Sequence, residues 1–482
     1  MNRMTQNQRL APRIATSGLV ALAVTACGGL PTTPTHVHDP GVRNTLSPAG
    51  APAPLPGLTT DELLFFQDGL QRFMVTEVVT GGHDNNRTSN GLGPRFNSNQ
   101  CASCHLQPTV GGSSPAVNPL IVIATEHGAR NSVPWFIAAN GPVREARFIQ
   151  ANGTADGGVH NLFVITGRDD APGCRLDQPD FRPAGNPRTG RGGNPNIVFR
   201  TPTPVFGAGL VEAIPDAAIL ANLKHEKSAK AGMGIYGRPN AHLSGNTNLS
   251  GNDGTITRFG WKAQNKSLLM FAGEAYNVEM GVSNQLFPQE RDESPGCNGF
   301  NPTPEDTVNF PSGSTATAAI SVISDIEAFA NFMRLLAPPV PASSTPSTKN
   351  GLSKFVSVGC AYCHTPAMTT GTRIASGSAT RPSLALSNRP VNLWSDLLVH
   401  HMGTGLTDGI TQGAAGPDEF RSAPLWGVGQ RIFFLHDGRT SDLVEAIEAH
   451  QSPGSEANRV IERFNRLDIK DQQDMINFLR SL

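Results

Sequence analysis

Two short stretches decide how this chain folds: Cys101-Ala102-Ser103-Cys104-His105 and Cys360-Ala361-Tyr362-Cys363-His364. Each has the spacing Cys-x-x-Cys-His, which is the attachment motif of a c-type haem. The two thiols bond to the porphyrin, and the adjacent imidazole becomes an axial ligand of the iron. A zinc site would need four converging ligands, and a thioredoxin-like redox pair needs no following histidine. The sequence therefore predicts two covalently bound haem c groups.

The N-terminus has the features of an export signal. Three arginines precede the apolar run 14–26, which fits a signal-peptide core and is too short to span a bilayer. The run ends in Val24-Thr25-Ala26-Cys27-Gly28, which looks like a bacterial lipobox with Cys27 acylated, although an ordinary cleaved signal peptide is the alternative. Several acyl chains would anchor the protein stably. We therefore predict an exported protein, lipid-anchored to the outer membrane on the periplasmic face of the bacterial envelope.

The cysteine count, the net charge and the composition limit the possible disulfides, partners and architecture. The chain has 7 cysteines, of which four belong to the haem motifs and one is Cys27, so Cys174 and Cys297 are available for a disulfide in an oxidising compartment. The net charge is −1 and no basic run is present, so we expect no nucleic-acid partner. The 51 glycines and 38 prolines predict a loop-rich architecture.

An internal duplication predicts the domain organisation. The helical pattern of residues 325–336 returns at 471–482, and Phe-Arg followed by Pro-x-x-Gly-x-Gly occurs at 199–209 and again at 420–429. We predict a mainly α fold with two cytochrome-c-like haem domains, the first enlarged by a long loop-rich insertion. The expected segments are a signal peptide with lipobox (1–27), a flexible tether (28–57), a catalytic N-terminal haem domain (58–340) and an electron-transfer haem domain (346–482).

His450 is the strongest candidate for the second axial ligand of the C-terminal haem. Ser441 is a plausible N-cap, and spacings of three and four place Leu443, Ile447 and His450 on one helix face. A lone inward histidine is also compatible with a satisfied core residue. Two further residues compete for the ligand position: Met402 and His436.

The N-terminal haem has no comparable partner. His83, His127 and His160 do not stand in a helical pattern that would position them, and the stretch after His105 is rich in Gly, Pro and Ser. We therefore expect this iron to keep an open or easily opened position, which makes it the substrate site.

The stretch from Phe434 to Arg439, followed by His450, resembles the C-terminal haem domain of bacterial di-haem cytochrome c peroxidases. In that family the residue fourteen beyond this loop's histidine is a methionine ligand, so the resemblance implies a His-for-Met replacement that lowers the haem potential. Trp261 and Glu279 are similar in setting to the family's bridging tryptophan and catalytic glutamate. The alternatives are core packing for Trp261 and a solvated helix end for Glu279.

Residues 91–97, 206–214 and 258–263 resemble the more specific di-haem oxidoreductase family, often labelled thiol-oxidoreductase-like. The chain lacks a histidine soon after His105, a feature shared with methylamine dehydrogenase maturation enzymes and haem-dependent rubber oxygenases. The resemblance implies reduction of hydrogen peroxide at the N-terminal haem. It also implies electrons supplied by a small cytochrome c or cupredoxin, and in many members a calcium ion. A di-haem electron-transfer cytochrome, a haem-dependent oxygenase and a non-enzymatic sensor lipoprotein remain as alternatives.

Overall fold

The computed structural model describes ten stretches of the chain. They are residues 36–43, 52–77, 92, 95–123, 133–148, 163–164, 197–241, 256–288, 323–374 and 382–482. The predicted signal peptide with Cys27, the pair Cys174 and Cys297, and the alternative ligands His83, His127 and His160 lie outside these residues.

Helices dominate the described residues, in agreement with the prediction of a mainly α fold. The longer helices are α1 (Thr60–Phe73), α5 (Asp216–Lys224), α7 (Leu268–Met280), α8 (Asp325–Leu335), α9 (Pro346–Val358), α12 (Asn458–Asn465) and α13 (Ile469–Ser481). The shorter ones are α2 (Cys101–Cys104), α3 (Leu120–Ile123), α4 (Ala208–Glu212), α6 (Lys227–Met233), α10 (Gly403–Leu406) and α11 (Leu443–Glu448), with 3-10 turns η3 (Cys360–Tyr362) and η4 (Val428–Gln430).

The strands form four antiparallel pairs. These are β1 (Arg95–Phe96) with β3 (Phe163–Val164), β2 (Glu145–Phe148) with β4 (Ile197–Arg200), β5 (Met368–Thr369) with β6 (Pro390–Val391), and β7 (Val399–His401) with β8 (Glu419–Arg421). Each pair is too short to build a core of its own. Packing between helices therefore organises the described residues.

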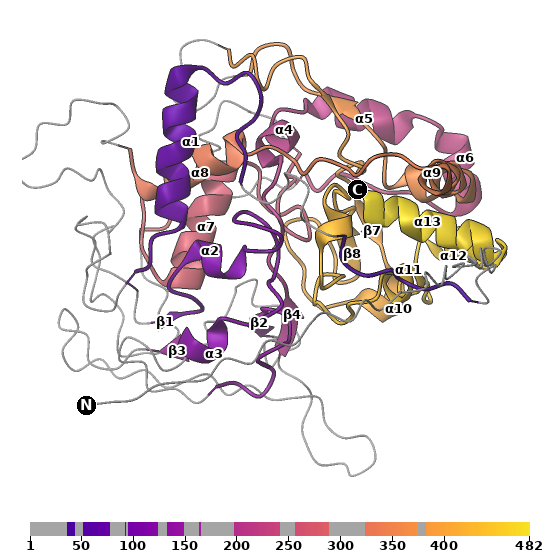
Figure 1. The fold of residues 1–482 in the computed structure, drawn as a ribbon, viewed down its shortest axis with the longest axis horizontal. Coiled ribbons are helices and arrows are strands. Elements are labelled where there is room, and N and C mark those ends of the chain that lie inside the picture. Colours follow the sequence, from indigo (N-terminus) through magenta and orange to yellow (C-terminus); the bar gives the residue numbers. More distant parts are fainter. Residues whose placement is uncertain are drawn as a thin grey trace, which may run out of the picture. The chain divides into compact units, whose positions relative to one another are not determined.

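Two helix pairs repeat one packing scheme, α1 against α8 and α9 against α13 (Figure 1). In the first pair Gly69 of α1 lies against the main chain of Ala328, and in the second Gly351 of α9 lies against that of Asp474. A Cβ at either glycine would overlap the facing carbonyl oxygen, so only glycine permits this approach. The internal duplication seen in the sequence therefore has a structural counterpart, while the division into two haem domains stays a prediction.

A second contact repeats in the same way. Gly209 of α4 lies against the carbonyl of Arg334, and Gly429 of η4 lies against the carbonyl of Arg480. Arg334 forms a buried ion pair with Glu212, three residues beyond Gly209, at 2.6 Å. No acidic residue stands three positions beyond Gly429, and Arg480 pairs instead with Asp39 at 2.5 Å.

This ion pair changes the expectation for the predicted tether. Asp39 also accepts a hydrogen bond from the Leu443 amide at 2.7 Å, and Leu55 donates to the Leu335 carbonyl at 2.8 Å. Composition favoured extended, mobile chain over 28–57, but the described residues of this stretch pack on the helices. The physical reason is a buried guanidinium at Arg480 that needs a carboxylate.

Helix α1 buries Phe66, Gly69 and Phe73, whereas Leu63 and Leu64 of the same helix are exposed. In the described part of the chain, no helix is both long and apolar enough to cross a membrane.

Candidate haem sites

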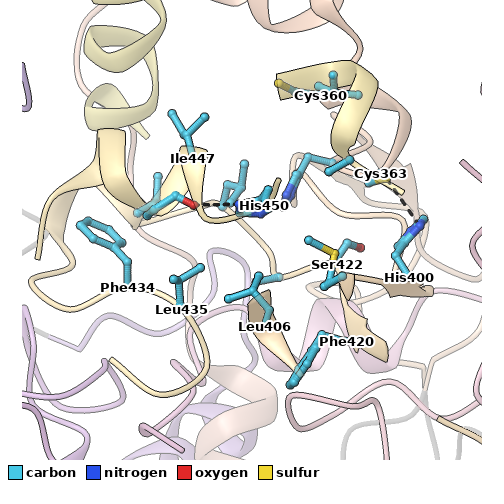
Figure 2. Close-up of a pocket in the computed structure, with 18 of the residues that line it drawn as sticks. Cys360, Cys363, His400, Leu406, Phe420, Ser422, Phe434, Leu435, Ile447 and His450 are labelled. Atoms are coloured by element: carbon cyan, nitrogen blue, oxygen red, sulfur yellow. Dashed lines mark hydrogen bonds between the residues drawn. The ribbon is translucent and has the colours of Figure 1, made fainter. Parts of the chain in front are cut away.

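The second Cys-x-x-Cys-His motif borders a large, mainly apolar pocket, which we call the C-terminal pocket. It contains about 1330 Å³ of space, part of it open to solvent, and is bordered by α9, α11, α13 and β8. Cys360, Cys363, His364 and His450 all line it, and Figure 2 shows three of these side chains around the same space. A pocket of this kind, apolar with a few convergent polar groups, suits a cofactor.

Backbone carbonyls orient two of the histidines that line the C-terminal pocket, His364 and His450. His364 Nδ1 lies 3.1 Å from the Trp394 carbonyl oxygen, and His450 Nδ1 lies 2.8 Å from the Ala446 carbonyl oxygen. Each carbonyl fixes the proton on Nδ1 and leaves Nε2 as the basic nitrogen, which is the usual arrangement of an iron-binding imidazole. The two rings are close enough for the charge of His450 to lower the pKa of His364.

Burial keeps these imidazoles neutral. Burial, with a smaller contribution from His450, lowers the pKa of His364 to about 4, and burial lowers the pKa of His450 as well. A metal ligand must be deprotonated. Both rings therefore meet that condition at neutral pH without help from a metal.

The first motif borders a smaller pocket, which we call the N-terminal pocket, with about 990 Å³ of empty space. Cys101, Cys104 and His105 line it, and His105 Nδ1 lies 3.1 Å from the Gly112 carbonyl oxygen. Burial lowers the pKa of His105 to about 4. The first motif thus repeats the arrangement of the second.

The four cysteines are free thiols. Burial raises the pKa of Cys104 to about 11 and that of Cys360 to about 12, and it also raises the pKa values of Cys101 and Cys363. Each pair lies beside its pocket with a neutral histidine next to it. Thiols, imidazoles and apolar walls together fit one covalently attached haem in each pocket.

Trp261 and Glu279 both line the N-terminal pocket, and their roles as bridging and catalytic residues stay predictions. Trp261 also lines the C-terminal pocket, so one side chain borders both spaces. Its indole nitrogen donates to the Thr201 carbonyl at 2.8 Å, and its ring meets that of His436 edge-on at 6.4 Å between centroids. These contacts hold the indole between the two pockets.

The comparisons with known proteins agree with this geometry. The family described as "Di-haem oxidoreductase, putative peroxidase" matches residues 194–482, more than half of the chain. The chain belongs to the di-haem oxidoreductase family. Family membership implies haem cofactors, and it agrees with the resemblance drawn from the sequence. No curated protein matches the chain.

Three solved structures show a limited similarity to parts of this di-haem oxidoreductase. Hydrazine synthase of Kuenenia stuttgartiensis is 17% identical with a TM-score of 0.21, over 34% of this chain and 56% of its own. The diheme peroxidase BthA of Burkholderia thailandensis is 16% identical with a TM-score of 0.27, over 47% of this chain and 65% of its own. A MauG-like protein associated with microbial copper homeostasis is 15% identical with a TM-score of 0.26, over 58% of this chain and 89% of its own. The di-haem oxidoreductase therefore spans less than two thirds of the first two.

The other two candidate ligands of the C-terminal haem, Met402 and His436, line the C-terminal pocket together with His450. His436 stacks on Phe420 at 4.3 Å between centroids, and burial lowers its pKa to about 4. The helix expected to carry His450 is α11, but its N-cap is Asp442 rather than Ser441, and it ends before His450. The His450 amide still donates to the Ile447 carbonyl at 3.1 Å.

Sequence reasoning missed a buried charged cluster beside Cys363. His400 lies between Asp396 and Glu456, with nitrogen–oxygen distances of 3.0 and 2.8 Å, and its Nδ1 is 3.6 Å from Cys363 Sγ (Figure 2). Burial opposes its charge, but the neighbouring negative groups raise the pKa of His400 well above its usual value. Because these residues are separated by up to 93 positions in the chain, no local pattern could have indicated the cluster.

Further polar side chains of the N-terminal pocket were also missed: Glu145, Arg200, Gln264 and Glu274. Glu145 favours the charged form of His105, although burial dominates the pKa of that histidine. Of these four residues, only Arg200 belongs to a motif that the sequence repeats. The repeat is therefore the one sequence feature that could have indicated a pocket residue among them. Within the described residues, no group of three or more His, Cys, Asp or Glu side chains forms a metal site, and the calcium ion implied by the resemblance stays a prediction.

Proposed function

We propose that this di-haem oxidoreductase reduces hydrogen peroxide in the N-terminal pocket, using electrons that enter through the C-terminal pocket. The observation that carries the proposal is the position of Trp261, whose side chain lines both pockets. An enzyme that collects electrons at one haem and uses them at another needs such a bridge. A carrier that only stores electrons does not.

The two pockets differ in the groups that face a haem. Among the described residues that line the N-terminal pocket, His105 is the only histidine, whereas His364 and His450 both face the C-terminal pocket. Two imidazoles would close both axial positions of the second iron, and one would leave a position for substrate at the first. This difference supports a reactive N-terminal site and an electron-transfer C-terminal site.

When bound, the haem irons supply the electrons and an open coordination position in the N-terminal pocket. The chain itself supplies the proton transfer. In the reaction, one hydrogen peroxide, two electrons and two protons give two molecules of water. We assign Glu279 the transfer of a proton from one peroxide oxygen to the other, because its carboxylate lines the pocket of His105. Glu145 and Glu274 line the same pocket and can relay the further protons.

Trp261 is fixed for its proposed role by the main chain around it. Its indole N–H donates to Thr201 of the segment after β4, and its carbonyl accepts the Arg421 amide at 2.9 Å from β8. The ring cannot rotate without breaking the hydrogen bond to Thr201, and the backbone hydrogen bond from Arg421 fixes the position of the residue that carries it. We assign it the electron path between the pockets.

The reaction needs an external source of electrons, for which we propose a small cytochrome c or cupredoxin. Such a donor fits an exported protein on the periplasmic face, anchored through Cys27, as the N-terminal sequence predicts. Stable anchoring would require more than one acyl chain.

Rapid mixing of the haem-loaded protein with hydrogen peroxide tests this proposal. We expect a fast spectral change in the half-reduced protein that is reversed by a reduced donor, and a much slower return in Trp261→Phe. Glu279→Gln should slow the peroxide reaction by about 100-fold or more, because general acid–base groups contribute at least that much. An unchanged spectrum in both oxidised and half-reduced protein would overturn the peroxidase proposal and favour an electron-transfer cytochrome. A stable oxygen adduct would favour an oxygenase.

A further inference from the structure

Two half-buried arginines of the C-terminal pocket differ from the fully buried arginines of the described residues. Each of the others contacts a carboxylate: Arg72 with Asp325, Arg200 with Asp408, Arg258 with Asp216, Arg334 with Glu212 and Arg480 with Asp39. This is the expected pattern, because a buried charge is costly without a partner. Arg421 and Arg431 have no carboxylate partner within the described part of the chain.

The side chains of Arg421 and Arg431 are close together and half-buried. Burial lowers the pKa of each to about 10, and repulsion from Arg431 adds to the shift at Arg421. Arg421 uses its Nε to donate to the Gly260 carbonyl at 3.0 Å, which leaves its two terminal nitrogens. Two neighbouring guanidiniums thus present at least two donor groups that no described carboxylate satisfies.

Arg421 and Arg431 both border two cavities. They line the C-terminal pocket and also a third cavity of about 580 Å³, which Trp261 and Trp426 border as well. None of the described residues lining that third cavity is acidic. Of the described residues that line the C-terminal pocket, only Glu456 is acidic, and it already pairs with His400. The arrangement requires negative charge from a group that enters the pocket.

We propose that Arg421 and Arg431 bind the propionate carboxylates of the C-terminal haem and raise its reduction potential. A guanidinium matches a carboxylate with two parallel N–H donors, so the pair supplies the geometry as well as the charge. Positive charge near an iron disfavours the oxidised, more positive state. The two arginines therefore offset the lowering of potential that a second histidine ligand brings, and they keep this haem able to accept electrons from a donor.

The internal duplication sharpens the assignment. Arg200 occupies in the first repeat the position that Arg421 occupies in the second, since each follows a phenylalanine before the Pro-x-x-Gly-x-Gly motif. Arg200 is neutralised by a buried ion pair with Asp408, and it lines the N-terminal pocket. In the second repeat the equivalent arginine, Arg421, has no carboxylate partner and can bind a ligand. The electrostatic effect is therefore specific to the C-terminal haem.

Potentiometric titration of the haem-loaded protein tests the inference without peroxide, so that it can fail independently of the proposed function. We expect Arg431→Gln and Arg421→Gln each to lower the midpoint potential of the C-terminal haem, with a larger shift in the double variant. The midpoint should also become more pH-dependent near neutrality, because a propionate without its guanidinium takes up a proton more easily. Arg421→Lys should restore part of the potential, since it keeps the charge.

Arg439→Gln is the matched control, because Arg439 is exposed and pairs with Asp437 at 2.8 Å outside both pockets. It should leave both midpoints unchanged. Arg431→Gln is the deciding variant, since no described side chain or carbonyl accepts a hydrogen bond from the Arg431 guanidinium. An unchanged midpoint and pH profile in this variant at full haem content would overturn the proposal, as would a larger shift at the N-terminal haem or an equal shift in the control.

Discussion

The two halves of this di-haem oxidoreductase share a scaffold but differ in the charges that surround their pockets. In both, a helix that precedes the haem motif packs on a terminal helix through a glycine, and a second glycine packs on the carbonyl of an arginine. Around the N-terminal pocket the lining arginine is neutralised and three glutamates face the space. Around the C-terminal pocket two arginines lack carboxylate partners, and His364 and His450 both line the space.

The duplication preserved the packing of the helices, whereas the residues that line the two pockets diverged in their chemistry. Glycine contacts between helices tolerate no side chain, so both copies keep them. The pocket walls carry no such restriction. One copy could become a site for proton transfer and the other a site for electron transfer, with Trp261 on the border of both.

The largest expected effect comes from removing one attachment site at a time. Cys101→Ala with Cys104→Ala should leave one haem per chain and abolish peroxide turnover, because the reactive pocket then lacks its attached haem. Cys360→Ala with Cys363→Ala should also leave one haem, with a reactive site that no longer receives electrons. Haem content per chain and the absorption spectrum measure both outcomes. Full haem content in either double variant would contradict covalent attachment at that motif.

A smaller effect is expected from the ligand that distinguishes the pockets. His450→Ala should convert the C-terminal haem from low spin to high spin, and added imidazole should restore the original spectrum, because the His450 imidazole is the second axial ligand in our proposal. Electron paramagnetic resonance resolves the two haems. Met402→Ala and His436→Ala are the matched controls, since both side chains line the same pocket. A spin change in either control, with none in His450→Ala, would transfer the ligand role to that residue.

The haem motifs and the terminal helices were predictable from the sequence because their signals are local. Cys-x-x-Cys-His is read within five residues, and the predicted helices 325–336 and 471–482 correspond to α8 and α13. The 3.6-residue periodicity of these segments is a local signal that predicts an amphipathic helix.

The electrostatic differences were not predictable because they depend on pairs that are distant in the chain. Asp39 and Arg480 are 441 positions apart, and Arg200 and Asp408 are 208 apart. A sequence shows which residues carry charge but not which charges meet. For this reason the packing of the described part of residues 28–57 was not predictable, and the lack of a carboxylate partner at the half-buried Arg421 and Arg431 became visible only in the structure.

The smallest effect concerns the shared scaffold. Gly209→Ala and Gly429→Ala should each lower the free energy of unfolding by about 1–3 kcal/mol, because the added Cβ would overlap the carbonyl of Arg334 or Arg480 and force backbone shifts. Gly232→Ala is the matched control: Gly232 lies in α6, and nothing comes within 4 Å of a Cβ there. It should be neutral or stabilising by up to about 1 kcal/mol, since alanine favours a helix over glycine. Urea unfolding measures all three. Similar losses of stability at the two positions would mean that both halves depend on the same contact between a glycine and an arginine carbonyl. If Gly209→Ala behaved like the control while Gly429→Ala did not, the duplicated sequence would not correspond to a duplicated stabilising contact, and the packing of the N-terminal half would need another explanation.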